Sequence, residues 1–208
     1  MQHLHILVCL PAIFLILLHS KSGKPLEPIF DTEGNELIQG EKYYIIPSNC
    51  GPEGGLIVTQ KNTTWTLFVA QDISPLNNGN PITIIPVTNT HPVRLSSSVH
   101  IQFVSCASCL ESVVWKIGDP QGAYGRRHVV LAGEVRGDTG HGVGQFRIEK
   151  VETGHGGHII IFCPKVCKLC RSACQNVGAF IEGGKSWLGL EGLPLIIAFK
   201  KNNQFYDV

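Results

Sequence analysis

The sequence predicts an all-β fold, and three observations lead to this prediction. Short runs rich in β-branched and aromatic residues recur along the chain, and no stretch has the apolar spacing of an amphipathic helix. The 23 glycines and 12 prolines of the 208 residues often bound these runs, as turn residues do. A barrel or a sandwich of about twelve strands is therefore expected.

The expected strands can be followed in order from residue 43 to residue 200. Most combine Val, Ile, Phe, Tyr or Trp with a turn residue at one end, as in YYIIP at 43–47 and ITIIP at 82–86. The predicted strands are 43–47, 56–59, 66–70, 82–86, 92–95, 100–104, 113–117, 128–132, 145–150, 157–162, 178–182 and 195–200.

The first residues predict a secretory signal peptide. Residues 4–18 are almost wholly apolar, are too short to span a bilayer comfortably, and are followed by the small residues Ser20 and Ser22. We expect cleavage near Ser22, so that residues 1–22 are removed and residues 23–208 form one domain. The region before the apolar run has no Lys or Arg, which leaves a retained anchor as the alternative. The expected location is extracellular, or vacuolar by way of the secretory pathway.

Charge and composition limit the classes of partner that are expected for the mature chain. The formal net charge is +1, with both signs scattered, so neither nucleic acid nor an anionic membrane is an expected partner. A sequon at Asn62 predicts glycosylation. Eight cysteines fall to seven when Cys9 leaves with the signal peptide, and an odd number leaves one thiol unpaired or joined to a second chain in a disulfide-linked dimer.

Four cysteines lie within a dozen residues. They are Cys163, Cys167, Cys170 and Cys174. Their separations of 4, 3 and 4 place two pairs opposite each other in one antiparallel register, on one face, at a separation that a disulfide can bridge. We predict an outer bridge Cys163–Cys174 and an inner bridge Cys167–Cys170. A zinc or iron–sulfur site could use the same residues on a helix, but an oxidising compartment and the proline after the first cysteine disfavour it.

Several motifs follow one another along the mature chain in a specific order. They are IFDTEGNELIQGEKYYII at 29–46, GGLIV at 54–58, VRLSSSVHIQF at 93–103, CLESVVWKIGD at 109–119, GQFRIEK at 144–150, IIIFCPKVC at 159–167 and PLIIAFKK at 194–201. In this order they resemble the plant Kunitz (soybean trypsin inhibitor) family, and the cysteine run is most similar to its miraculin-like branch. The resemblance implies a β-trefoil of about twelve strands and a protease inhibitor that is not an enzyme and has no catalytic residues, cofactor or metal.

The resemblance also implies a reactive loop between ITIIP and VRLSSS. Its residues are Val87, Thr88, Asn89, Thr90, His91 and Pro92. A trypsin-like pocket requires Arg or Lys, and the loop has neither, so the expected target is a cysteine, aspartic or elastase-like serine protease, with Thr90 or His91 at the P1 position. The alternative is a polar turn without a target, in a non-inhibitory defence, storage or ligand-binding protein on the same scaffold.

Two departures from the family pattern concern the loop and the first disulfide. Gln39 stands where the family often has an Asn that braces the reactive loop. Trp65 stands where the first cysteine of the first disulfide is expected, so Cys50 is the candidate partner of Cys109. Cys106 is an extra cysteine, and bridges from Cys106 to Cys50 or to Cys109 remain open.

Other motifs have simpler explanations. His141, His155 and His158 could bind a metal, but glycine-flanked histidines in a hairpin are more often solvated. The tripeptide at 136–138 spells Arg-Gly-Asp in a glycine-rich turn, and Arg126-Arg127 suits a solvated turn entering a strand better than a cleavage site. We therefore expect neither a metal site nor catalysis.

Overall fold

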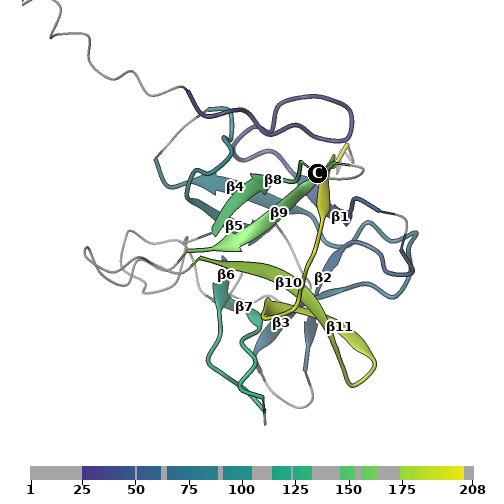
Figure 1. The fold of residues 1–208 in the computed structure, drawn as a ribbon. Coiled ribbons are helices and arrows are strands. Elements are labelled where there is room, and N and C mark those ends of the chain that lie inside the picture. Colours follow the sequence, from purple (N-terminus) through teal and green to yellow (C-terminus); the bar gives the residue numbers. More distant parts are fainter. Residues whose placement is uncertain are drawn as a thin grey trace, which may run out of the picture.

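The computed structural model describes residues 25–49, 51–61, 65–88, 91–104, 114–122, 124–132, 146–152, 156–163 and 174–203 (Figure 1). These residues contain thirteen strands and no helix, so none of them forms a helix that could cross a membrane. The strands are β1 (Tyr43–Pro47), β2 (Leu56–Gln60), β3 (Leu67–Gln71), β4 (Ile82–Pro86), β5 (Val99–Phe103), β6 (Val114–Ile117), β7 (Val129–Ala132), β8 (Phe146–Lys150), β9 (His158–Phe162), β10 (Gln175–Glu182), β11 (Lys185–Leu190), β12 (Leu193–Pro194) and β13 (Ile197–Lys201).

Six of the strands form a closed barrel. Strand β1 pairs with β4, β4 with β5, β5 with β8, β8 with β9, β9 with β13, and β13 returns to β1. All six pairings are antiparallel. Closure leaves no free edge in the ring, which removes the unpaired backbone groups that an open sheet would expose.

Three hairpins cover one end of this barrel. They are β2–β3, β6–β7 and β10–β11, and β3 contacts the other two through Phe68↔Val130 and Ala70↔Trp187. Along the chain, a barrel strand, a hairpin and a second barrel strand recur three times. This threefold arrangement is a β-trefoil, and Figure 1 shows the hairpins in the lower part of the view, away from the β4 and β5 strands.

The barrel interior is filled by alternate residues of its strands. In β5, Val99, Ile101 and Phe103 are at most 1% exposed, whereas the residues between them are partly exposed. Trp115 and Phe146 meet edge to face inside the core, with ring centroids 6.1 Å apart. The period of two that the sequence displays in these strands is therefore the inside–outside alternation of the barrel wall.

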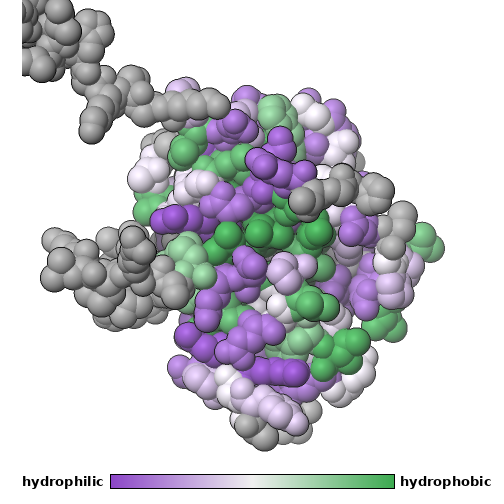
Figure 2. Space-filling model, in the orientation of Figure 1, coloured by the Kyte–Doolittle hydropathy of each residue, from purple (hydrophilic) through white to green (hydrophobic). Residues whose placement is uncertain are grey.

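The surface mixes polar and apolar residues. Figure 2 shows hydrophobic residues gathered near the middle of one face, over the strands that Figure 1 labels β9 and β10. Large exposed apolar side chains also occur elsewhere, among them Trp65, Ile73, Leu76, Tyr124, Ile181 and Leu193. Singly exposed apolar residues are usual on soluble domains, so their scatter calls for no special explanation.

The predicted strand at 92–95 is wrong. All the other predicted strands overlap an observed one. Val93 instead donates to Leu37 O and accepts from Ile29 N, so its two backbone groups bond to two separate pieces of the N-terminal segment rather than to one partner strand. Two strands, β11 and the short β12, were not predicted.

Candidate functional site

The connection between β4 and β5 is pinned where it leaves the barrel. The two strands pair over five residues, from Ile82↔Phe103 to Pro86↔Val99, and Val87 N then donates to Ser98 O at 2.9 Å. Beyond this bond the side chains of Val87, Thr88 and His91 are exposed, and Pro92 is half-buried. Asn89 and Thr90 lie outside the described residues. The described part of the predicted reactive loop is therefore an exposed segment on a fixed base.

The returning side of the connection docks on the N-terminal segment. Ile29 N donates to Val93 O at 3.1 Å, Val93 N donates to Leu37 O at 2.9 Å, and Leu95 N donates to Glu27 O at 2.8 Å. Val93 itself is fully buried. These bonds fix the main chain on both sides of Val93, whereas the side chains of Val87, Thr88 and His91 are exposed.

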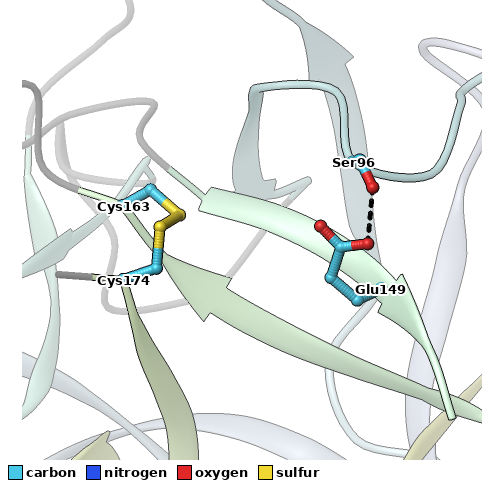
Figure 3. The surroundings of a disulfide bond; sticks show 4 residues. All are labelled: Ser96, Glu149, Cys163 and Cys174. Carbon is cyan, nitrogen blue, oxygen red and sulfur yellow. Dashed lines mark hydrogen bonds between the residues drawn. A yellow bond between two sulfur atoms is a disulfide. The ribbon is translucent and has the colours of Figure 1, made fainter. Parts of the chain in front are cut away.

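Two serines fix the returning side of the β4–β5 connection. Ser96 bonds to strand β8, and Ser97 bonds to a residue of the connection itself. Ser96 N donates to Ile148 O at 3.0 Å and Ser96 Oγ donates to Glu149 Oε2 at 2.6 Å (Figure 3). Ser96 has a φ of 59°, a left-handed conformation that is unfavourable for a residue other than glycine, and these bonds hold it there. Ser97 Oγ donates to Arg94 O at 2.7 Å. This anchor could not be predicted, because nothing in one sequence links position 96 to position 149.

Gln39 lies in the segment that borders the connection. It follows Leu37, the acceptor of the Val93 N–H, and precedes the turn at Gly40. Gln39 is half-buried, and its Oε1 is buried with no hydrogen-bond partner among the described residues. Nearby, Ile38 N donates to the Tyr43 hydroxyl at 3.0 Å, and burial raises the pKa of that phenol. The bracing role of Gln39 stays a prediction, since Asn89 and Thr90 are outside the described residues.

A second cluster of functional groups joins the three hairpins at the opposite end of the barrel. Lys61 follows β2, His128 precedes β7 and Glu182 ends β10, so each hairpin contributes one residue. Lys61 Nζ donates to both carboxylate oxygens of Glu182 at 2.9 Å. His128 Nε2 lies 3.2 Å from Glu182 Oε2 and 3.1 Å from Lys61 Nζ.

Aromatic rings enclose this cluster, which we call the cap triad. The rings of Phe180, Phe68 and Trp187 have centroids 5.0, 5.4 and 6.2 Å from that of His128. Burial, and then the charge of Lys61, lowers the pKa of His128, whereas the hydrogen bond from Lys61 lowers the pKa of Glu182.

The chemistry of the cap triad is structural. A His–Glu pair could act as a general base, but the other ring nitrogen of His128, Nδ1, is buried and has no partner within the described part of the chain. Among the described residues, neither a serine hydroxyl nor a cysteine thiol is hydrogen-bonded to His128. The contacts of the triad among the described residues therefore tie the three hairpins together.

The histidine and arginine motifs can be placed in part. His158 opens β9, where burial, and then the charge of Lys150, lowers its pKa. The described residues contain no group of three or more His, Cys, Asp or Glu side chains that could hold a metal ion. Arg126 lies over the Phe180 ring at 4.8 Å and Arg127 Nε donates to Gly118 O at 3.2 Å. The remaining motif residues, His141, His155 and 136–138, lie outside the described residues.

The structure contains the outer bridge of the cysteine run. Strands β9 and β10 pair through Phe162↔Gln175, and the next opposed pair, Cys163 and Cys174, forms a disulfide with Cα atoms 4.3 Å apart (Figure 3). This is the register that the spacing of the four cysteines predicts. The positions that lie outside the described residues are Cys50, Asn62, Cys106, Cys109, Cys167 and Cys170.

The trefoil and its anchored β4–β5 connection can be compared with known proteins. A family model for Kunitz-type legume inhibitors, described as "Trypsin and protease inhibitor", matches residues 29–201. The chain belongs to this family of Kunitz-type inhibitors. The match spans the barrel, the hairpins and the connection, so the Kunitz resemblance of the sequence motifs is confirmed over most of the chain.

Individual Kunitz relatives are similar to this chain over most of its length. An alpha-amylase/subtilisin inhibitor of Oryza sativa subsp. japonica is 32% identical, covering 92% of this chain and 94% of its own. Miraculin of Synsepalum dulcificum is 29% identical over 86% and 84% of the two chains. Among solved structures, the Kunitz-type cysteine protease inhibitor PCPI-3 from potato has a TM-score of 0.72 at 27% identity and covers 87% of this chain and 100% of its own.

Proposed function

We propose that this protein is a secreted Kunitz-type inhibitor that presents residues 87–92 to a protease whose S1 pocket accepts an uncharged side chain. The observation that carries the proposal is the fixed base of the loop: Val87 on one side and Val93 and Leu95 on the other are held by backbone hydrogen bonds. A segment whose two ends are already held in place loses less conformational entropy when a protease binds it than a free segment does.

The absence of a basic residue argues against a trypsin-like target. Residues 87–92 contain neither Lys nor Arg. A neutral P1 residue would leave the buried carboxylate of a trypsin-like pocket unpaired, which is unfavourable by about 3–5 kcal/mol. Subtilisin and cysteine proteases, which the names of two similar inhibitors mention, are better candidates. Residues 1–22 would direct the protein into the secretory pathway before they are removed.

A second candidate is a binding protein that uses the same scaffold without inhibition. Gln39 favours it, because it stands where the family often has the Asn that braces the reactive loop. The similarity to miraculin, whose name does not refer to inhibition, points the same way.

A panel of proteases distinguishes the two candidates. The secreted protein would be titrated against subtilisin, papain, pancreatic elastase, pepsin and trypsin, and residual activity measured at equilibrium. Inhibition of at least one enzyme at sub-micromolar concentration, with trypsin much weaker, supports the inhibitor. Activity of every enzyme at micromolar concentrations of the protein contradicts it and favours the binding protein.

A further inference from the structure

A cavity of about 360 Å³, which we call the hairpin cavity, lies between the turn of the β6–β7 hairpin and the end of β10. Its volume is within the range of pockets that hold small organic ligands. The lining residues are Gln121, Gly122, Tyr124, Arg126, Ile181 and Glu182. None of them belongs to the β4–β5 connection, so the cavity is separate from the predicted reactive loop.

The backbone holds both walls of the hairpin cavity in place. In the β6–β7 turn, Gln121 N donates to Arg126 O at 2.9 Å and Arg126 N donates to Gln121 O at 3.0 Å. On the other wall, Ile181 and Glu182 lie in the part of β10 that pairs with β11. The side chains that line the cavity therefore start from a fixed main chain, which lowers the entropy lost on binding.

Arg126 brings unused hydrogen-bond donors to the cavity. Its guanidinium carbon lies 4.8 Å from the centroid of the Phe180 ring and 5.7 Å from that of the Tyr124 ring, so two aromatic rings position it. Within the described residues, the guanidinium has no hydrogen-bond acceptor. Its planar fork can donate to two neighbouring oxygen atoms of a ligand.

Glu182 offers an acceptor on the facing wall. Both of its carboxylate oxygens accept from Lys61 Nζ at 2.9 Å, and Oε2 also lies 3.2 Å from His128 Nε2. Oε1 therefore keeps room for a second donor. The side chain is 39% exposed, and the hydrogen bond from Lys61 lowers the pKa of the carboxyl, so an ionised acceptor is accessible at neutral pH.

Exposed apolar surface completes the cavity. Tyr124 is 83% exposed and Ile181 is 71% exposed. The C–H groups on the face of a sugar ring carry a small positive charge, which suits the negative face of an aromatic ring. The cavity thus combines hydrogen-bond donors, an acceptor and an aromatic face.

These groups together select one class of ligand. An anion would pair with Arg126, and Lys61 offsets part of the repulsion from Glu182, but an anion brings no hydrogen for the Glu182 carboxylate. A cation would pair with Glu182 but not with Arg126. An apolar compound would cover both side chains without bonding to either, which is unfavourable. A ring with neighbouring hydroxyl groups brings donors, acceptors and an apolar face at once.

We propose that the hairpin cavity binds a neutral sugar unit, whose ring face packs against Tyr124 and whose hydroxyl groups accept from Arg126 and donate to Glu182 Oε1. The proposal does not depend on protease inhibition, because the lining residues lie outside residues 87–92.

The test uses simple glycosides on the mature chain. Protein NMR would follow titrations with methyl β-D-glucoside, methyl β-D-galactoside and methyl α-D-mannoside. We expect at least one of them to bind with a dissociation constant on the order of millimolar, and to shift the amide signals of Gln121, Gly122 and Ile181 most. No binding of any of the three at tens of millimolar, or shifts centred elsewhere, would overturn the proposal.

Two compounds of related shape test the ligand class. (Tetrahydropyran-2-yl)methanol has the sugar ring without its neighbouring hydroxyl groups, and methyl β-D-glucuronide adds a carboxylate. The first should bind at least fivefold more weakly than the best glycoside, and the second no more tightly than methyl β-D-glucoside. Two results would overturn the proposal: equal binding of the first would remove the role of the hydroxyl groups, and tighter binding of the second would make this an anion site.

Two variants and a matched control locate the site. Tyr124→Ala and Arg126→Gln should each weaken binding at least fivefold. Trp65→Ala, which removes a 95% exposed aromatic ring that does not line the cavity, should leave binding unchanged. If Arg126→Gln does not fold, Tyr124→Ala still decides the question, because so exposed a side chain can be removed with little effect on stability. Unchanged binding in Tyr124→Ala, or an equal loss in Trp65→Ala, would contradict the assignment whatever the protease panel shows.

Discussion

The two ends of the barrel are held together by different means. At the hairpin end, side chains make the contacts: the cap triad and the rings of Phe68, Phe180 and Trp187 bridge all three hairpins. At the loop end, main-chain bonds at Val87, Val93 and Leu95 fix the β4–β5 connection. The contacting side chains at the hairpin end are therefore committed to stability, whereas those of Val87, Thr88 and His91 are exposed and available for recognition.

The largest effect should come from the hairpin end. Trp187 is 5% exposed, stacks edge to face with Phe68 at 5.8 Å, and donates its indole N–H to Glu182 O at 2.9 Å. Trp187→Ala should lower the free energy of unfolding by about 3–5 kcal/mol, through the lost burial and the cavity that remains. Denaturant unfolding at 25 °C measures this loss. Inhibition by the fraction of the protein that stays folded should not change. A parallel loss of inhibition would show that the hairpin end also contributes to recognition.

The Cys163–Cys174 disulfide lies between the two ends, where β9 leaves the barrel and β10 begins its hairpin. Replacing both cysteines with serine should lower the free energy of unfolding by about 2–3 kcal/mol, because the unfolded chain regains the freedom of the closed loop. Urea titration with and without the double substitution gives the difference. If the midpoint and slope of the urea unfolding curve are unchanged, the backbone pairing of β9 with β10 is enough to hold the two strands together.

Each end contains a histidine that resists protonation in the folded state. Burial is the main cause of the lowered pKa at both His128 and His158; Lys61 and Arg126 add to it at His128, where Glu182 opposes it. The unfolded chain then takes up protons first, so stability should be full above the ordinary histidine pKa of about 6.5 and decline as the pH falls below it. Glu182 should add a further loss at more acidic pH, because its pKa is lowered too.

Unfolding measured between pH 8 and pH 5 tests this decline. His128→Asn and His158→Gln should each flatten it, apart from any uniform loss of stability. A decline that remains as steep as that of the wild type in both variants would assign it to other groups.

The smallest predicted effect concerns the loop brace. Gln39→Asn shortens the amide whose oxygen is buried without a partner in the described part of the chain, and so brings the side chain closer to that of the family pattern. Inhibition of the protease found in the panel should strengthen by up to about tenfold, equivalent to about 1.4 kcal/mol. The melting temperature should change little. Weaker inhibition would mean that Gln39 already serves as the brace.

The sequence predicted the parts of the fold that depend on local pattern. Strands such as β5 and β8 alternate in burial as their sequences do, and the spacing of the cysteines predicted the register at Cys163 and Cys174. Strand β11 was missed because its KSWLGL has no β-branched residue, although the two glycines before it, both with positive φ, are typical of a two-residue hairpin.

The contacts that hold the site could not be predicted, because they join distant positions. His128 is 67 residues from Lys61 and 54 from Glu182, and Ser96 is 53 residues from Glu149. The error at 92–95 has the same origin, since an apolar run that bonds to two different segments has the composition of a strand but no single partner. Such contacts form only in the folded barrel, so the local sequence pattern does not reveal them.

One measurement tests most directly whether residues 87–92 act as a preorganised reactive loop. Thr90→Arg and His91→Arg supply the charge that a trypsin-like pocket requires without altering the bonds of Val87 and Val93. Ile73→Arg, at a position 79% exposed in the connection from β3 to β4, is the matched control for an added arginine. At least one loop variant should bind trypsin about a hundredfold more tightly than the wild type, equivalent to about 2.7 kcal/mol, while Ile73→Arg gains nothing. If both loop variants keep the melting temperature of the wild type and yet fail to inhibit trypsin or are rapidly cleaved at the new arginine, the loop is not a reactive loop.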